Sequence, residues 1–441
     1  MKTDPAAAVR DYIASLRVPA APPVSRIVGR SRRVSRVRAW LVPVPAGLVV
    51  AAVLLLSSLR AGTGQAPQIA DDGRPPALPT RFAGYSYFTG SVSQSPPGPA
   101  IAVYQQGWGV ELADFPQGLV LGARGDVYRR VDLADSREDS QDQGDPAPML
   151  LSPDGTQVAV GSHNGLGDLA LLDLRTGRVR SVPAARGRAV RPLAWSRDER
   201  RIAAIELSKS ASNQTFAGAL VVFDLTDGTA KRWPEHQAIS MAVFSPRGDE
   251  LAVQGEGIYI LDLDGRRVRT LTPPGQPYLT SEAAWSPDGG LIAAINREEP
   301  QNSGVYSLVF LDPTGRDQAL PNPIRGVAHN AVVGWTAADR LLTRTDDQLV
   351  EVDIRSAQRR TLSEFNTSGG NYAMARIQFA ADLLVGVQIR AADNPNRGPW
   401  PIWWQNALAI IILLTGLAVT MLTRRLMRRR HSRPRATRTP I

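Results

Sequence analysis

The sequence predicts an all-β fold, a seven-bladed β-propeller with six blades as the alternative, flanked by two transmembrane α-helices. Three observations predict this fold. A strand-rich unit recurs at spacings of 41–50 residues, an uncharged run lies on each side of the repeats, and arginines crowd the far side of each run. A chain of 441 residues is too long for one ordinary single-core domain, whereas a repetitive fold accommodates that length.

Each repeat opens with a large apolar residue and a tight turn. The clearest copies are Leu151-Ser-Pro-Asp-Gly155, Phe244-Ser-Pro-Arg-Gly248 and Trp285-Ser-Pro-Asp-Gly289, and weaker copies begin at Trp195, Trp335 and Phe379. After most of these turns an apolar strand follows, and then a second strand that ends at one of the aspartates Asp173, Asp224, Asp262, Asp312 and Asp353. Turn residues between short apolar strands are typical of antiparallel meanders.

Side chains at equivalent positions of the repeats have an expected role. We expect Trp195, Phe244, Trp285, Trp335 and Phe379 to fill the space between neighbouring sheets, with ligand stacking as the lesser alternative. The strand-end aspartates are expected to accept local backbone N–H groups. Both roles are structural.

The number of blades depends on how the two ends of the repeat region are counted. One meander cannot bury both of its faces, and stacking several around an axis solves that problem. Residues 82–132 have the strand pattern of a degenerate blade, and the unit at Phe379 lacks outer strands. Counted separately they give seven blades. If the N-terminal strands merge into the closing blade, they give six.

The turn and the Leu-Asp-Leu strand that follows it resemble the TolB-type, WD-like propeller repeat over about residues 148–390. With its uncharged runs, the chain looks like a membrane-anchored bacterial variant of this repeat, of actinobacterial type. The resemblance implies a propeller that binds proteins or peptides through its loops and central channel. It does not imply the Tol–Pal role, because the α/β domain of TolB-type proteins is absent here.

The two uncharged runs predict membrane spans. Residues 39–59 and 401–422 carry no charged side chain, and about 20 apolar residues suffice to cross a bilayer as a helix. Indole rings favour the membrane interface, so Trp40, Trp400, Trp403 and Trp404 are predicted interfacial anchors. A cleavable signal peptide is the alternative for the first run, although its 38-residue leader is long.

Charge asymmetry predicts the topology. Residues 1–60 hold 10 basic and 2 acidic side chains, residues 403–441 hold 8 basic and none acidic, and the body between them has 33 basic and 39 acidic. The positive-inside bias therefore predicts cytoplasmic ends and an extracytoplasmic propeller at the plasma membrane, and the acidic body argues against a nucleic-acid partner. The expected segments are a cytoplasmic segment 1–38, span 39–59, linker 60–80, propeller 81–398, span 401–422 and a basic tail 423–441.

The cytoplasmic segment contains one candidate binding element. Val9, Tyr12, Ile13 and Leu16 fall at i, i+3, i+4 and i+7 of a short predicted helix and form one apolar stripe. So short a helix is marginal alone, and we expect its stripe to be covered by a cytoplasmic protein partner or by the membrane surface.

Residues with catalytic or metal-binding chemistry are scarce. The chain has no cysteine and only four isolated histidines, and it contains no nucleophile elbow, phosphate loop or zinc-peptidase motif. Acidic residues of the loop 132–145 carry oxygens that suit Ca²⁺, but their spacing fits no known calcium loop. We therefore predict no catalytic residue, no metal and no cofactor.

The predicted function is that of a non-enzymatic module that binds a protein, a peptide or an envelope polymer outside the cytoplasm. Two alternatives remain. One is a transmembrane regulator of anti-sigma type that couples the propeller to a cytoplasmic partner. The other is an enzyme that acts on glycans or peptides with paired carboxylates in the propeller cavity.

Overall fold

The computed structural model describes residues 73–107, 116–137, 145–162, 165–208, 218–236, 238–273, 275–298, 305–316, 318–329, 331–366 and 374–431. The chain divides into two compact units, residues 1–60 and 61–441, and every described residue belongs to the second. The first predicted span, its Trp40 and the stripe of Val9, Tyr12, Ile13 and Leu16 therefore lie outside the described residues.

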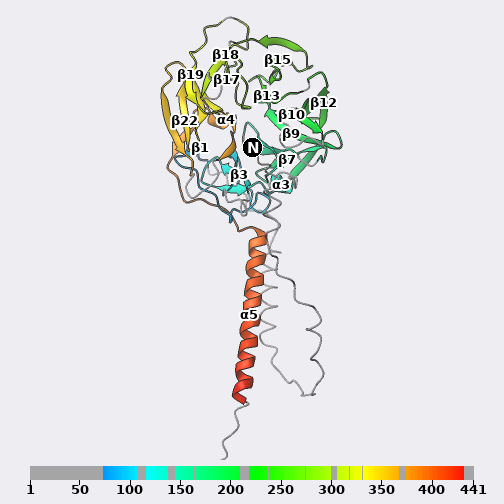
Figure 1. Cartoon of the computed structure of the whole chain (residues 1–441), viewed down its shortest axis with the longest axis vertical. Coiled ribbons are helices and arrows are strands. Elements are labelled where there is room, and N and C mark those ends of the chain that lie inside the picture. Colours follow the sequence, from blue (N-terminus) through cyan, green and yellow to red (C-terminus); the bar gives the residue numbers. More distant parts are fainter. Residues whose placement is uncertain are drawn as a thin grey trace, which may run out of the picture. The chain divides into compact units, whose positions relative to one another are not determined.

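Within the described residues, six antiparallel sheets surround a central axis as the blades of a propeller (Figure 1). Blade I combines β24 (Ala375–Phe379) with β2 (Ala100–Gln106), β3 (Gln117–Gly122) and β4 (Tyr128–Arg130). Blade II contains β5 (Met149–Leu151), β6 (Gln157–Val160), β7 (Asp168–Asp173) and β8 (Val179–Pro183). Blade III contains β9 (Arg188–Trp195), β10 (Arg201–Ser208), β11 (Ala219–Asp224) and β12 (Thr229–Trp233).

The other three blades continue the ring. Blade IV contains β13 (Met241–Phe244), β14 (Glu250–Gln254), β15 (Ile258–Asp262) and β16 (Arg267–Leu271). Blade V contains β17 (Ile292–Arg297), β18 (Tyr306–Leu311) and β19 (Ile324–Val327). Blade VI contains β20 (Val332–Ala337), β21 (Arg340–Arg344), β22 (Gln348–Asp353) and β23 (Arg359–Glu364). The propeller expected from the repeats is thus confirmed.

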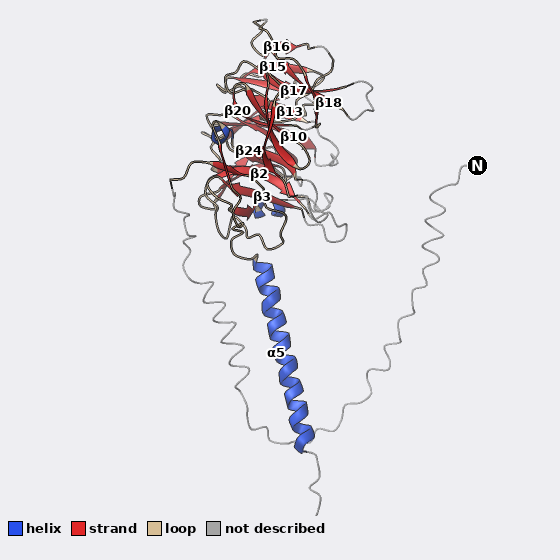
Figure 2. Ribbon diagram, turned by 90° about the vertical axis from the view of Figure 1, so that its left-hand side faces the viewer, coloured by secondary structure: helices blue, strands red, loops and turns tan. Residues whose placement is uncertain are grey.

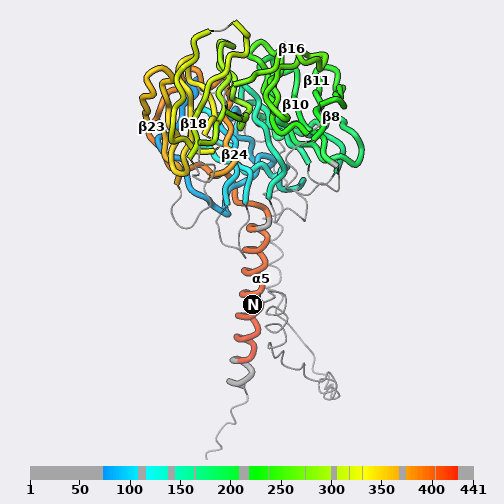
Figure 3. Tube along the Cα trace, turned by 45° about the horizontal axis from the view of Figure 1, so that its top comes forward, coloured from blue at the N-terminus to red at the C-terminus, as the bar shows by residue number. Residues whose placement is uncertain are grey.

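The expectation of seven blades was wrong, because the two ends of the repeat region share blade I. β24 pairs antiparallel with β2, so that Phe379 faces Ala102, and the N-terminal strands supply the outer part of the sheet (Figure 3). Residues 83–89 form no continuous strand, and after β24 the chain continues into α4 (Ala381–Leu384) and the short β25 (Gln388–Arg390). Neither end therefore has strands for a blade of its own.

A second contact strengthens the closure of the ring. β1 (Ala77–Pro79) pairs in parallel with β25. The Thr80 N–H donates to the Arg390 carbonyl at 2.8 Å, and the Thr80 carbonyl accepts the Glu364 N–H at 2.9 Å. Residues 77–82 thus join the end of β23 in blade VI to the segment that follows blade I. Both ends of the repeat region therefore take part in closing the ring.

The hydrophobic core of the described residues consists of six clusters, one between each pair of neighbouring blades. Residues of β9–β11 pack against those of β13–β15 in one such cluster, and strands of blade VI pack against blade I in another. Burial between sheets is what holds a propeller together, at about 25 cal/mol for each Å² of apolar surface removed from water.

Turn chemistry explains why the repeats form hairpins. Gly155, Gly248 and Gly289 adopt φ of 71–79°, a conformation that glycine enters without strain. The strand-end aspartates accept local N–H groups as expected: Asp173 Oδ1 accepts those of Arg175 and Thr176 at 2.8 and 2.9 Å.

The repeat region is followed by one long helix, α5 (Ile402–His431) (Figure 2). Its stretch Trp404–Arg425 has a mean hydropathy of 2.1 over its most apolar window, which makes it the one helix of the described residues long and apolar enough to span a membrane. The large apolar side chains from Ile410 to Leu414 are exposed. Two flanking spans were expected. The first lies outside the described residues, and α5 is a candidate for the second.

α5 begins beside a surface aromatic of the propeller. The Phe88 ring lies 4.7 Å from that of Trp400 and 5.2 Å from that of Trp404, measured between ring centroids. Just before the helix, Arg397 Nη1 donates to Thr89 Oγ1 at 3.0 Å, and the Gly90 N–H donates to the Arg397 carbonyl at 2.8 Å. These contacts tie the start of the helix to the loop that precedes blade I.

Candidate binding site in the central channel

The innermost strands of the blades line a central channel with two pockets. On β9, Arg191 and Pro192 line one pocket and Trp195 lines the other. On β24, Arg376 lines the first pocket and Phe379 lines the second. Glu282 and Val333 line both pockets. The two pockets are therefore successive sections of one channel, which we call the arginine end and the aromatic end.

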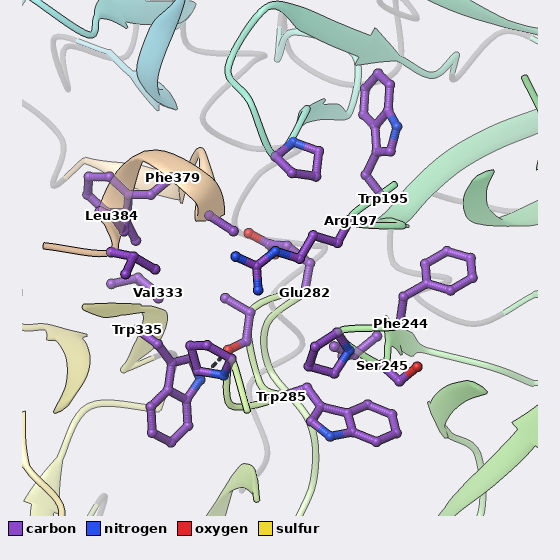
Figure 4. Close-up of a pocket in the computed structure, with 18 residues that line it drawn as sticks. Trp195, Arg197, Phe244, Ser245, Glu282, Trp285, Val333, Trp335, Phe379 and Leu384 are labelled. Atoms are coloured by element: carbon purple, nitrogen blue, oxygen red, sulfur yellow. Dashed lines mark hydrogen bonds between the residues drawn. The ribbon is translucent and has the colours of Figure 1, made fainter. Parts of the chain in front are cut away.

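The aromatic end is lined by the recurring large residues of the repeat. Trp195, Phe244, Trp285, Trp335 and Phe379 are only 4–7% exposed, each belongs to an inter-blade core cluster, and each also borders the pocket (Figure 4). The pocket contains about 660 Å³ of empty space, including solvent at its mouth. These residues thus fill the space between blades and also border the channel.

Polar contacts fix the walls of this end. Trp335 Nε1 donates to the Ala283 carbonyl at 2.9 Å, and Trp285 Nε1 donates to the Gly289 carbonyl at 3.2 Å. Arg197 lies toward the centre of the pocket (Figure 4). Its Nε pairs with Asp382 of α4 at 2.8 Å. Both members of this pair are partly exposed, so a ligand can reach them.

Glu282 stands in the channel because the innermost strand of blade V is interrupted. Tyr278 bridges to Ile295 and Trp285 bridges to Ile292, but the residues between them do not pair with β17 as a continuous strand. Burial raises the pKa of the Glu282 carboxyl to about 7, while its own backbone N–H partly opposes that rise. Glu282 is therefore a titratable group at neutral pH, placed where the two pockets meet.

The arginine end is wider and more polar. It contains about 800 Å³ of empty space, again including open solvent, and its wall carries Arg191, Arg344, Arg376, Thr280 and Gln378. Gln378 is already occupied, since its Nε2 donates to the Met149 carbonyl at 3.0 Å and its Oε1 accepts the Leu151 N–H at 3.1 Å. Burial and the nearby charge of Arg376 lower the pKa of Arg191 to about 10.

A pair of carboxylates lies beside the aromatic end, in the turns of blades II and III. Glu199 Oε1 accepts the Asp154 N–H at 3.1 Å. Burial and the neighbouring Asp154 raise the pKa of Glu199 to about 7, whereas hydrogen bonds from Glu199, Thr156 and Ser152 outweigh burial and lower that of Asp154. Such separated pKa values also occur in acid–base pairs of enzymes. Asp154, however, is engaged in its own turn through Ser152 and Thr156 at 2.7–2.9 Å.

Other sequence-predicted features are dispersed. Asp132 and Asp135 of the acidic loop belong to α3 (Asp132–Ser136), where Asp132 accepts the Ser93 N–H at 3.3 Å and Asp135 pairs with Arg130 at 3.4 Å. Residues 138–144 of that loop lie outside the described residues. Within the described part of the chain, no cluster of three or more His, Asp or Glu side chains is placed to hold a metal ion.

The predicted membrane anchors are placed in part. Trp400 and Trp404 pack on Phe88 at the start of α5, and Trp400 is about half exposed. The side chain of Trp403 and all of Trp40 are outside the described set. Their role at a membrane interface remains a prediction.

Sequence reasoning missed the charged residues of the channel, although a signal exists. The residue three positions before the repeat's large apolar residue lines the arginine end in all six blades, namely Pro148, Pro192, Met241, Glu282, Val332 and Arg376. Two of these six are charged, at a position where the other blades have apolar residues. Arg344 follows no such rule, because it ends a second strand, β21.

Comparisons with known proteins gave matches among solved structures. No protein-family model and no curated protein matches the chain. Among solved structures it is similar to TolB from Acinetobacter baumannii, with 17% identity and a TM-score of 0.46 over 64% of this chain and 67% of that one. It is also similar to an oligogalacturonate lyase in complex with manganese, with 15% identity and a TM-score of 0.44 over 66% and 79% of the two chains.

A second oligogalacturonate lyase, from Vibrio parahaemolyticus, shows 13% identity and a TM-score of 0.41 over 66% of this chain and 82% of that one. The β-propeller fold itself rests on the six sheets that surround the central axis. Likeness at this level concerns the fold alone, and the function has to be argued from the channel.

Proposed function

We propose that the protein is a membrane-anchored binding module whose propeller captures a protein, peptide or envelope polymer outside the cytoplasm without chemical turnover. The ligand enters the central channel and contacts both ends of it. One observation carries the proposal: a continuous channel joins a section bordered by large apolar residues to a section that carries arginines, which suits a ligand with apolar and polar parts.

The anchor supports the location. α5 exposes its apolar side chains along a length that fits a bilayer, and arginines follow it in the sequence. Phe88 and Trp400 provide exposed aromatic surface beside its start, where a headgroup layer would lie. The two-span topology, with residues 39–59 as the other span, is part of the proposal.

Site-specific photo-crosslinking in intact cells tests the binding role. A photoreactive amino acid at Val385, which is 51% exposed and borders the aromatic end, is expected to form an adduct with the ligand. The matched control is the same substitution at Val268, which is 47% exposed on the outer strand β16.

The channel proposal requires an adduct at position 385 that is absent at position 268. It also requires that Arg197→Ala, which removes a partly exposed channel cation, reduces the yield at position 385. Equal adducts at both positions, or none at either, would place the ligand elsewhere.

An enzymatic role is the second candidate, favoured by the carboxylate pair Asp154 and Glu199 with its separated pKa values. Purified full-length protein can be assayed for cleavage of oligosaccharides and peptides. The binding-module account expects no turnover. Cleavage that disappears in Glu199→Gln, while the variant unfolds at the wild-type temperature, would establish the enzyme instead.

A further inference from the structure

The arginine end contains a buried cation whose hydrogen-bonding capacity the protein does not use. Arg344 is only 6% exposed, yet its Nε and Nη1 atoms have no hydrogen-bond partner among the described residues. The backbone around it is ordinary, since the Arg344 N–H donates to the Ala331 carbonyl at 2.8 Å. The donors without a partner therefore belong to the guanidinium of Arg344, a residue that borders the channel.

The other buried arginines of the described chain, Arg129 and Arg137, have hydrogen-bond partners for their guanidinium groups. Arg129 donates to the carbonyls of Ser95, Tyr128 and Asn396 at 2.8–2.9 Å, and Arg137 donates to the Gly161 carbonyl at 2.8 Å and pairs with Asp168. Buried donors are nearly always satisfied, because an unmet donor costs about 1–3 kcal/mol and more when it is charged. Arg344 departs from this pattern inside a cavity, where a ligand could supply the acceptor.

The surroundings of Arg344 suit an anion. Thr280 Oγ1, on the same wall, is also buried without a partner in the described residues. Arg191 and Arg376 add two cations that are close enough to affect each other's charge. Arg376 adopts φ of 50° next to an irregular register between β2 and β24, and such irregularities re-aim side chains at binding sites.

Two carboxylates oppose this positive charge. Asp346 lies two residues beyond Arg344 and interacts with its charge, and Glu282 borders the same pocket. Three arginines thus border one cavity, and among the described residues the Nε and Nη1 atoms of Arg344 have no hydrogen-bond partner.

We propose that the arginine end is an oxyanion site, in which Arg344 and the Thr280 hydroxyl donate hydrogen bonds to a carboxylate or phosphate group of the channel ligand and Arg191 and Arg376 add positive charge. This inference deepens the proposed function by naming the chemistry that the ligand must carry. Charge-assisted hydrogen bonds of this kind are stronger than neutral ones and are directional.

Thermal unfolding of the full-length protein in detergent tests the site with inorganic phosphate and with acetate as probes. Each salt replaces chloride at constant ionic strength, so that a general salt effect is held fixed. An anion that binds only the folded state raises the melting temperature as its concentration passes the dissociation constant. The two probes separate a phosphate site from a carboxylate site.

Arg344→Gln is the decisive variant, and Arg355→Gln is its matched control, because Arg355 is an exposed arginine in the turn after β22. At least one anion is expected to raise the melting temperature of the wild type and of R355Q. Loss of a charge-assisted contact should weaken binding about tenfold or more in R344Q. Should R344Q fail to fold, Arg376→Gln, at an exposed position, is expected to weaken binding several-fold.

The inference is overturned if neither anion stabilises the wild type beyond chloride, or if R344Q responds as strongly as R355Q. These outcomes are distinguishable from failure of the proposed function. A protein with no ligand adduct at Val385 can still bind phosphate, and a protein that captures a ligand in the channel can still ignore both anions.

Discussion

At the scale of single residues, the channel is defined by ionisable groups in unusual surroundings. Glu282, Arg191 and Arg344 all border one cavity, and burial favours the neutral form of each. It raises the pKa of Glu282 and lowers the pKa values of Arg191 and Arg344. Residues of this kind are more costly to the fold than apolar ones would be. Ionisable groups with shifted pKa values in the wall of a cavity are typical of a functional site.

Glu282 gives a prediction on pH dependence. Its pKa is raised from 4.5 to about 7 in the folded protein, so folding favours the protonated carboxyl. The associated stability is complete below about pH 4.5, is lost as the pH rises to about 7, and does not change above that. Glu282→Gln should therefore stabilise the protein above pH 7, by up to about 3 kcal/mol.

Chemical unfolding of full-length wild type and E282Q at several pH values measures this difference. The two proteins are expected to have similar stability near pH 4.5 and to diverge between pH 5 and 7. A constant difference across the whole range would show that Glu282 titrates normally in the folded protein.

At the scale of elements, the segment between the propeller and α5 is held by a buried ion pair. Arg390 Nη2 of β25 lies 2.8 Å from Asp126 Oδ1, the Asp126 carboxylate is almost fully buried, and the Asn396 N–H donates to the Asp126 carbonyl at 2.7 Å. One aspartate in the β3–β4 turn thus fixes the chain on its way to the helix.

Asp126→Ala should destabilise the protein by about 2–4 kcal/mol, because it leaves the Arg390 guanidinium largely buried without its carboxylate. The control is Lys231→Ala, which breaks an exposed pair with Asp264 of similar length, 3.0 Å, and should cost less than about 1 kcal/mol. Denaturant midpoints of the two full-length variants measure both effects. Equal losses would contradict the role assigned to the buried pair.

At the scale of the whole molecule, the local units of the fold were predictable and the long-range pairing was not. The turns at Gly155, Gly248 and Gly289 and the strands beside them follow from local turn chemistry and alternation, and they formed as expected. The pairing of β24 with β2 joins residues that are 270–277 positions apart, and no local pattern specifies such a partner. The blade count was missed for that reason.

The candidate site was predictable to the same limited extent. Recurrence identified the large aromatic residues, because blades repeat the positions that pack between them. The cations were harder to find, since the channel wall differs from blade to blade and Arg344 reaches it from a second strand. Aligning the position three residues before each repeat would have found Glu282 and Arg376.

The central claim is a propeller outside the cytoplasm that binds ligands through its channel, and topology tests it most directly. The chain has no cysteine, so single cysteines can be introduced at Arg175, exposed in the β7–β8 turn, and at Arg438 in the basic tail. A membrane-impermeant maleimide applied to intact cells should label R175C, and should label R438C only after permeabilisation. Labelling of R175C that requires permeabilisation would place the propeller in the cytoplasm and contradict the account.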